Sequence, residues 1–298
     1  RSKGLAIDQI IEIKGFWGNG KEFHFLRPKA KKESTFEWKA LCGAAIFLGI
    51  IIKLKLKTQP LRPLLSWTAN LSLSQLSECI NHAESWPNSL SFQWIWGDNI
   101  FAHAIGEVIN TDHEAILINL LERLPFTSNR IIKKFNNMSS LPNLSLGNST
   151  TNRSTHSEVI GLLGPAWQSK NRQVLKVIKE LVDKRPNKSC YIASQQLGGL
   201  TQSKDIETSF VHRNAIWKPW INGAWEAQNQ LKRNTTLKWM ELSWNNLDFI
   251  CPGIHLAQIH PHLPWHQKEL SLAFKDWLPK LKKIKSMYDP KNVMPSLD

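Results

Sequence analysis

The pair His212-Arg213 combines two side chains whose types can do chemistry on a bound small molecule. A histidine exchanges protons near neutral pH, and an arginine can hold an anion or a polarised carbonyl group. The pair ends the segment 208–213, which follows Gly198-Gly199 after a short loop. The alternative is a structural pair that forms hydrogen bonds with loop carbonyl groups, and the sequence leaves both interpretations open.

Small residues at positions 42–45 precede a strand pattern and form a second candidate site. They allow another backbone, or a flat ligand, to approach the main chain closely. After Gly49 the alternation of lysine and leucine predicts a strand with one solvated face and one buried face. The alternative is a tight turn that leads into a core strand. The residues concerned are Cys42, Gly43, Ala44, Ala45, Gly49 and Ile50.

Tryptophans and histidines in the second half of the chain offer two further kinds of site. The tryptophans could line a pocket for an aromatic or sugar-like substrate, or they could fill a core. Metal ligation needs histidines at a helical or hairpin spacing with a carboxylate nearby, and Pro261 and Pro264 break both geometries. We therefore expect no metal site at the histidines. The residues are Trp217, Trp220, Trp225, His255, His260, His262 and His266.

Alternating patterns predict the strands that must position these residues. Residues 10–14 and 21–25 flank the turn-forming residues 18–20, which predicts a β-hairpin. Residues 89–96 alternate strictly between apolar and polar side chains. We therefore expect Trp94 and Trp96 to face a core.

Helical periodicity predicts the remaining elements. Apolar residues recur at helical spacing in 72–83, 111–121, 169–182 and 269–288, with a capping box at Thr111. In the second of these helices residues 116, 117, 120 and 121 should be buried, and Pro279 should kink the last one. The order of helices and strands predicts an α+β fold in which helices lie on one face of an antiparallel sheet.

Four stretches of the chain also follow a family pattern in the same order. Residues 4–8 read Gly-Leu-Ala-Ile-Asp and precede Asn19-Gly20, and residues 38–60 contain the small segment and end at Pro60. The third stretch is Gly198-Gly199 with the His-Arg pair, and residues 285–293 read Lys-Ser-Met-Tyr-Asp-Pro-Lys-Asn-Val. Together they resemble the FAD-linked oxidases of the vanillyl-alcohol-oxidase fold, with a PCMH-type FAD-binding domain, in the berberine-bridge-like branch.

The resemblance implies a set of site residues. His212 and Arg213 would be catalytic residues in the substrate pocket, and the small segment would lie at the cofactor. Alanine keeps that segment small, whereas Cys42, Ile46 and Phe47 depart from the family pattern of arginine, glycine and asparagine. The implied cofactor-binding residues are Gly43, Ala44, Ala45, Gly49, Ile50, Tyr288 and Asn292.

The resemblance also implies domains and an activity. Residues 1–65 would be the second half of the FAD-binding domain, residues 66–265 a substrate domain, and residues 266–298 a helix and tail that return to the FAD-binding domain. The implied activity is transfer of a hydride from a small organic substrate to flavin, with reoxidation by O₂ or another acceptor. The alternative is a truncated, inactive relative that acts as a binding or structural module.

In the family, the pyrophosphate-binding loop lies before the strand pattern that Gly4 opens here. The chain begins with Arg1 rather than Met, which favours a fragment of a longer protein. We therefore expect the 298 residues alone to bind FAD weakly or not at all, and to be inactive.

Composition narrows the class of partner. The net charge of +14 favours anionic ligands, but the lysines are scattered and no basic-aromatic module is present, so nucleic-acid binding is not expected. The apolar run from Ala44 to Ile52 is too short to span a bilayer.

The four cysteines form no C-x-x-C pair and are expected to be reduced thiols. No signal peptide is visible, and a cytoplasmic location is expected.

Overall fold

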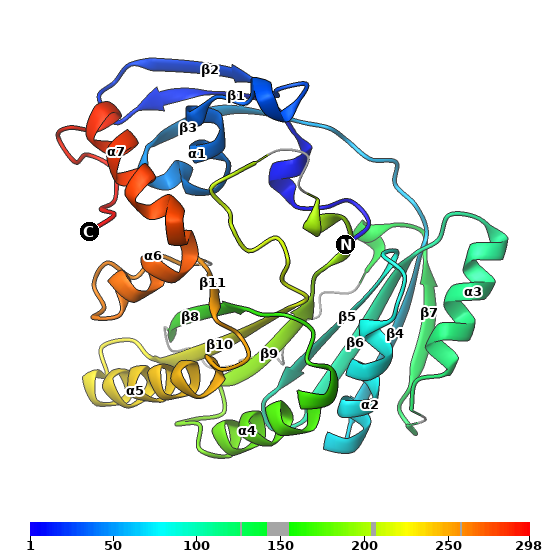
Figure 1. Ribbon diagram of the computed structural model, residues 1–298. Helices are drawn as coiled ribbons and strands as arrows, with labels where there is room; N and C mark the ends of the chain where they lie inside the picture. The colour runs from blue at the N-terminus through cyan, green and yellow to red at the C-terminus, as the bar shows by residue number, and fades with distance from the viewer. Residues whose placement is uncertain (126, 142–154, 204–206, 257) are drawn as a thin grey trace. The chain divides into compact units, whose positions relative to one another are not determined.

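The computed structural model describes residues 1–125, 127–141, 155–203, 207–256 and 258–298 (Figure 1). They form two compact units, each of which collects segments that are distant in the sequence. The first unit comprises residues 1–2, 60–198 and 215–258, and the second comprises residues 3–59, 199–214 and 259–298.

The second unit is built on a three-stranded antiparallel sheet with the order β2-β1-β3. The strands β1 (Ile10–Trp17) and β2 (Glu22–Leu26) form the predicted hairpin. Gly20 lies in the turn at φ +81°, a backbone conformation that glycine adopts without strain. On the other side of β1 lies β3 (Gly49–Leu56).

The side chains of β3 contradict the predicted pattern of one buried face. Every residue from Ile50 to Leu56 is exposed, and Ile52 retains 64% of its accessible surface. Among the described residues β3 is an edge strand of its sheet, and its side chains are exposed on both faces. An alternating sequence fixes which side chains share a face, but burial of that face needs a second layer of structure.

The predicted packing of the two ends of the chain is confirmed within the second unit. The Asn19 N–H donates a hydrogen bond of 2.7 Å to the carbonyl oxygen of Tyr288, and the Lys285 ammonium donates one to the carbonyl oxygen of Phe47. The remaining elements of the unit are helical. They are η1 (Ala6–Gln9), η2 (Lys31–Glu33), α1 (Phe36–Ala44), η3 (Ala45–Phe47), η6 (Gly199–Gln202), α6 (His266–Phe274), η7 (Lys275–Trp277) and α7 (Leu278–Tyr288).

The kink predicted at Pro279 is not found there. The helical run breaks at Lys275, which has φ +46°, and Pro279 lies in the first turn of α7. Proline is tolerated there because the first N–H groups of a helix have no intrahelical acceptor. The proline therefore starts the last helix and does not bend a continuous one.

The first unit contains an eight-stranded antiparallel sheet with the order β11-β8-β10-β9-β5-β6-β4-β7 among its described residues. Neighbours in this order are often distant in sequence, so the sheet depends on long-range contacts. The strands are β4 (Leu64–Leu71), β5 (Leu90–Trp96), β6 (Ile100–Glu107), β7 (Ile131–Phe135), β8 (Thr155–Leu163), β9 (Tyr191–Gln196), β10 (Trp217–Glu226) and β11 (Gly253–His255).

Helices cover one face of this sheet. α2 (Leu73–Glu84), α4 (Asn171–Asp183) and α5 (Gln230–Leu247) lie side by side along it (Figure 1). The side chain of Ser72 caps α2 by accepting from the Gln75 N–H, and the Gln75 side chain accepts from the Ser72 N–H. This reciprocal capping box explains why α2 begins at Leu73. The short helices η4 (Met138–Ser140) and η5 (Gln168–Lys170) complete the unit together with α3.

The helix α3 (Thr111–Glu122) departs from its prediction in two respects. Its N-cap is Asn110, whose side chain accepts from the His113 N–H, and not Thr111. Of the expected core residues only Leu117 and Leu121 are buried, while Ile116 is 55% exposed. Helical spacing identified the apolar stripe, but a stripe of this width is not fully covered by the neighbouring strand.

Tryptophans fill much of the core of the first unit. Trp94 is fully buried and Trp96 is 8% exposed, as predicted. The sequence left open whether three further tryptophans line a pocket or fill a core. Trp217 and Trp225 are buried, as expected of core residues, and Trp220 is half-buried. The predicted α+β class is confirmed, and within the described residues no helix is long and apolar enough to cross a membrane.

Candidate functional site

All nine site residues expected from the sequence lie in the second unit. They fall in three segments of the chain, namely the passage from α1 to β3, the segment that carries the His-Arg pair, and the end of α7 with the tail after it. The residues are Gly43, Ala44, Ala45, Gly49, Ile50, His212, Arg213, Tyr288 and Asn292.

The first segment is a break in α1. Gly43 has φ +153°, and a Cβ atom built on it would lie 2.5 Å from the Ser209 Oγ and 2.7 Å from the backbone nitrogen of Phe210. Only glycine fits both the backbone angle and the close approach of the neighbouring segment. The main chain of Gly43 is exposed, whereas Ala44 is fully buried and Ala45 is half-buried. The passage from α1 to β3 and the segment that carries the His-Arg pair therefore pack closely against each other at Gly43.

A different close contact explains why position 49 is a glycine. It is the first residue of β3 and pairs with Trp17, and a Cβ atom on it would lie 2.4 Å from the carbonyl oxygen of Phe16. Packing against β1 therefore requires this glycine without any cofactor. Its neighbour Ile50 is 60% exposed, so the Ile50 side chain remains accessible to a ligand.

The arginine of the His-Arg pair is held by a carboxylate. The Arg213 guanidinium donates to Asp8 at 2.8 Å and 3.1 Å, one hydrogen bond to each carboxylate oxygen. Asp8 also accepts from the Leu5 N–H at 2.8 Å, and Arg213 is buried. A buried arginine in a two-point pair has little freedom to move to a substrate. These contacts support the structural alternative for Arg213.

The histidine of the pair has a defined tautomer. Its Nε2 lies 2.7 Å from the carbonyl oxygen of Leu272, and a carbonyl oxygen can only accept, so Nε2 carries the proton. Burial lowers the pKa of His212 below its usual value, against the opposing effect of the hydrogen bond to Leu272. His212 is therefore neutral at pH 7, with its lone pair on Nδ1.

The end of α7 is fixed by a buried ion pair. The Lys285 ammonium lies 2.5 Å from Asp289 and also donates to the carbonyl oxygens of Phe47 and Met294. Asp289 accepts from the Val293 and Met294 N–H groups at 2.8 Å and 3.0 Å. Both charged residues are buried. The most specific motif in the sequence therefore anchors the C-terminal tail.

Tyr288 and Asn292 lie on either side of this anchor. The Tyr288 ring stacks on Trp17 with 4.2 Å between ring centroids, and its hydroxyl donates to Glu37 at 3.2 Å. Burial and the nearby Glu37 carboxylate raise the pKa of Tyr288. Asn292 is exposed at φ +51°, a left-handed conformation that asparagine tolerates.

The structure also identifies residues that the sequence reasoning did not assign to the site. Asp8 was visible as the last residue of the Gly-Leu-Ala-Ile-Asp motif, and the spacing of four between Lys285 and Asp289 was visible as a helical ion pair. No sequence signal identified Trp17 or Ser209. Ser209 donates from its hydroxyl to the carbonyl oxygen of Ala40 at 3.0 Å, which ties the His-Arg segment to α1.

The histidines and cysteines carry other roles. His260 is buried against Glu269, with Nδ1 at 2.8 Å from the nearer carboxylate oxygen. In the part of the chain that the structure describes, no group of three histidine, cysteine or acidic side chains could hold a metal ion. The four cysteines are buried free thiols, and burial raises the pKa of each.

The site residues fit a flavin only in part. The exposed main chain at Gly43 and the exposed Ile46 and Ile50 offer a surface that a flat ring could contact. The pyrophosphate of FAD needs cations or a cluster of N–H groups. Among the described residues of the unit, the two buried cations Arg213 and Lys285 already have carboxylate partners. The segments named here therefore offer a surface to a ring, while their two buried cations are already paired with carboxylates.

Comparisons with known proteins place this geometry in a fold family. No protein-family model matches the chain, and no curated protein matches its sequence. Among solved structures, Physcomitrella patens BBE-like 1 has a TM-score of 0.76 at 14% identity, with 98% of this chain and 65% of that chain covered. A chitooligosaccharide oxidase has a TM-score of 0.75 at 12% identity, with 98% and 66% covered.

A third solved structure is described as a flavoenzyme. This protein, CrmK, is involved in shunt product recycling in caerulomycin biosynthesis. It has a TM-score of 0.73 at 14% identity, with 98% of this chain and 70% of that chain covered. Identities this low show the fold alone. The chain has the mixed helix and antiparallel-sheet fold of BBE-like FAD-linked oxidases, and it spans 65% of the length of the first of these relatives.

Proposed function

We propose that this chain is part of an FAD-dependent oxidoreductase that oxidises a small organic molecule. The observation that carries the proposal is the fold match over 98% of the chain to enzymes that include an oxidase and a flavoenzyme. The order of the four sequence stretches supports it. Bound flavin supplies the acceptor for a hydride removed from the substrate.

In this proposal the second unit is the flavin-domain portion and the first unit is the substrate domain. The main chain from Gly43 to Ala45, together with Gly49 and Ile50, lies near the flavin ring, and Tyr288 and Asn292 belong to the same side of the site. His212 accepts a proton through Nδ1. Arg213 is a positioning residue, because Asp8 holds it and its guanidinium donates to the Thr208 hydroxyl in the segment before His212.

The substrate class follows only by analogy with the neighbours. A chitooligosaccharide oxidase among them makes oligosaccharides the first substrates to screen. The acceptor of the electrons is O₂ or a second small molecule. The alternative proposal is a binding module that keeps the fold without catalysis, and the limited fit to FAD favours it for these 298 residues taken alone.

The test compares two proteins, the 298-residue chain and the full polypeptide encoded in its reading frame. We expect the full polypeptide to purify with stoichiometric flavin, visible as yellow colour, and to be bleached anaerobically by a substrate. We expect the shorter chain to bind FAD weakly or not at all. The loss of several charged hydrogen bonds, at about 1.5–3 kcal/mol each, explains the difference.

Two results would change the assignment. A full polypeptide that is folded but binds no flavin would leave the binding-module alternative. Stoichiometric FAD on the shorter chain would show that residues other than those named here hold the pyrophosphate. Replacing His212 by glutamine in the flavin-loaded protein should lower kcat while the flavin content stays constant, since His212 is proposed to move a proton and not to bind the cofactor.

A further inference from the structure

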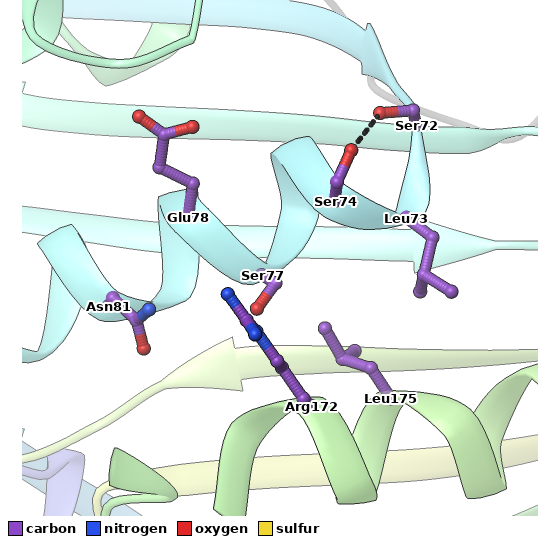
Figure 2. Close-up of a pocket in the computed structure, with 8 residues that line it drawn as sticks. All are labelled: Ser72, Leu73, Ser74, Ser77, Glu78, Asn81, Arg172 and Leu175. Atoms are coloured by element: carbon purple, nitrogen blue, oxygen red, sulfur yellow. Dashed lines mark hydrogen bonds between the residues drawn. The ribbon is translucent and has the colours of Figure 1, made fainter. Parts of the chain in front are cut away.

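A groove runs between α2 and α4 in the first unit, with a volume of about 830 Å³ (Figure 2). Arg172 of α4 points toward Ser77 of α2 (Figure 2). Leu73, which is half-buried, and Leu175, which keeps only 1% of its accessible surface, also line the groove. All four residues are in the described part of the first unit. The groove thus has a polar end and an apolar end, an arrangement typical of small-molecule sites.

The polar end is preorganised by a buried amide. Asn171 is 2% exposed, and its Nδ2 donates to the Ser77 carbonyl oxygen at 2.7 Å, to the Ser77 Oγ at 3.2 Å and to the Asn81 Oδ1 at 2.9 Å. Each of these bonds occupies one acceptor lone pair of Ser77 or Asn81 and uses none of their side-chain hydrogens. Their donors, the Ser77 hydroxyl hydrogen and the Asn81 amide hydrogens, therefore remain for another partner.

Arg172 adds a positive charge to these donors. Among the residues that the structure describes, no carboxylate or carbonyl oxygen pairs with the Arg172 guanidinium. Glu78 also lines the groove, but its side chain extends away from Arg172 (Figure 2). Three groups that can donate hydrogen bonds line the polar end of the groove, namely the Arg172 guanidinium, the Ser77 hydroxyl and the Asn81 amide, and the guanidinium is charged. Such a set of donors suits a carboxylate, because an ionised carboxylate is an anion that only accepts hydrogen bonds.

We propose that this groove binds a small monocarboxylate with a short branched aliphatic chain. The carboxylate lies against Arg172, Ser77 and Asn81, and the aliphatic chain lies against Leu73. Among the described residues that line the groove, Arg172 is the one cation and Glu78 is an acid, so the groove disfavours a dianion such as phosphate. The site belongs to the first unit and does not depend on flavin chemistry.

The test is a titration of the folded 298-residue chain with 4-methylpentanoate, followed by ligand-observed NMR and calorimetry. The neutral 4-methylpentanamide and inorganic phosphate are the comparison ligands. We expect saturable millimolar binding of the carboxylate, and weaker binding of both comparison ligands. Acetate should bind more weakly as well, because it lacks the aliphatic chain.

Matched variants separate the groove from general attraction to a basic protein. Arg172→Gln should weaken carboxylate binding about tenfold, whereas Lys176→Gln, on the same helix and exposed but outside the groove, should leave it within about twofold. Both changes remove one positive charge. Arg172→Lys, which keeps the charge but not the planar fork, should fall between them.

Several outcomes would overturn the proposal. They are absence of saturable binding, equal weakening by Arg172→Gln and Lys176→Gln, or phosphate binding as tightly as the carboxylate. Circular dichroism and the thermal midpoint of each variant establish that it is folded. Since both side chains are exposed, we expect no change in either measurement.

Discussion

Replacing Asp289 by asparagine tests whether the buried ion pair anchors the C-terminal tail. Asp289 has no exposed side-chain surface and Lys285 retains 7% of its own, so asparagine leaves a buried ammonium without its counter-charge. Removing one partner of a buried pair costs about 3–5 kcal/mol. We expect a loss near 3 kcal/mol in the free energy of unfolding, the lower end of that range. The reason is that the carbonyl oxygens of Phe47 and Met294 still accept from Lys285.

The assay is urea unfolding followed by far-UV circular dichroism, which reports on the helices and strands of both units. The matched control is Asp298→Asn, since Asp298 pairs with Lys282 at 2.5 Å but is 83% exposed. An exposed pair contributes about 0–1 kcal/mol, so this variant should unfold almost as the parent does. Equal losses in the two variants would refute the anchoring role.

The same pair predicts a dependence on pH. Burial raises the pKa of Asp289, but the hydrogen bonds from Lys285, Val293 and Met294 outweigh it and bring the pKa below its usual value. A depressed folded-state pKa means that the contribution is present above the unfolded pKa of about 3.9 and is lost as the pH falls through the folded pKa. The parent and Asp289→Asn should therefore converge in stability at strongly acidic pH.

Two further predictions concern a strained glycine and a buried histidine. Gly43→Ala should destabilise the protein by about 1–3 kcal/mol, because the backbone angle and the Ser209 hydroxyl both oppose a Cβ atom, whereas Gly20→Ala, which meets no atom within 4 Å, should cost less in the same unfolding assay. Equal costs would mean that only the positive φ matters. Burial lowers the pKa of His103 to about 4, so His103 is neutral in the folded protein and stability should fall as the pH drops from about 6.5 toward 4. His103→Phe should remove part of this acid sensitivity, and an unchanged pH profile of the thermal midpoint would contradict the assignment.

Local patterns were sufficient for much of the secondary structure. The hairpin of β1 and β2 follows from two alternating runs around a glycine turn, and α2 matches the helical spacing of residues 72–83. The strict alternation of β5 placed Trp94 and Trp96 in a core. These features depend on residues close together in the chain, so a single sequence contains the relevant physical information.

Partners distant in the chain explain the failures. The kink expected at Pro279 occurs at Lys275, and the buried face expected for β3 is exposed. The same limit applies to the site, where the role of Arg213 depends on Asp8, 205 positions away. A sequence pattern shows that a residue can form an ion pair or pack in a core, but it does not show which distant group completes the contact.

The sequence by itself determined the α+β class, the order of the elements and the residues worth testing as a site. The tertiary structure alone decided which of those residues have protein partners. In the folded chain Arg213 forms an ion pair with Asp8, and Lys285 forms one with Asp289. Ser209 occupies the space beside Gly43. The physical reason is that helix and strand patterns depend on neighbours a few residues apart. The partner of a buried charge, and the atom that lies against a glycine, come from distant parts of the chain that meet only in the folded protein.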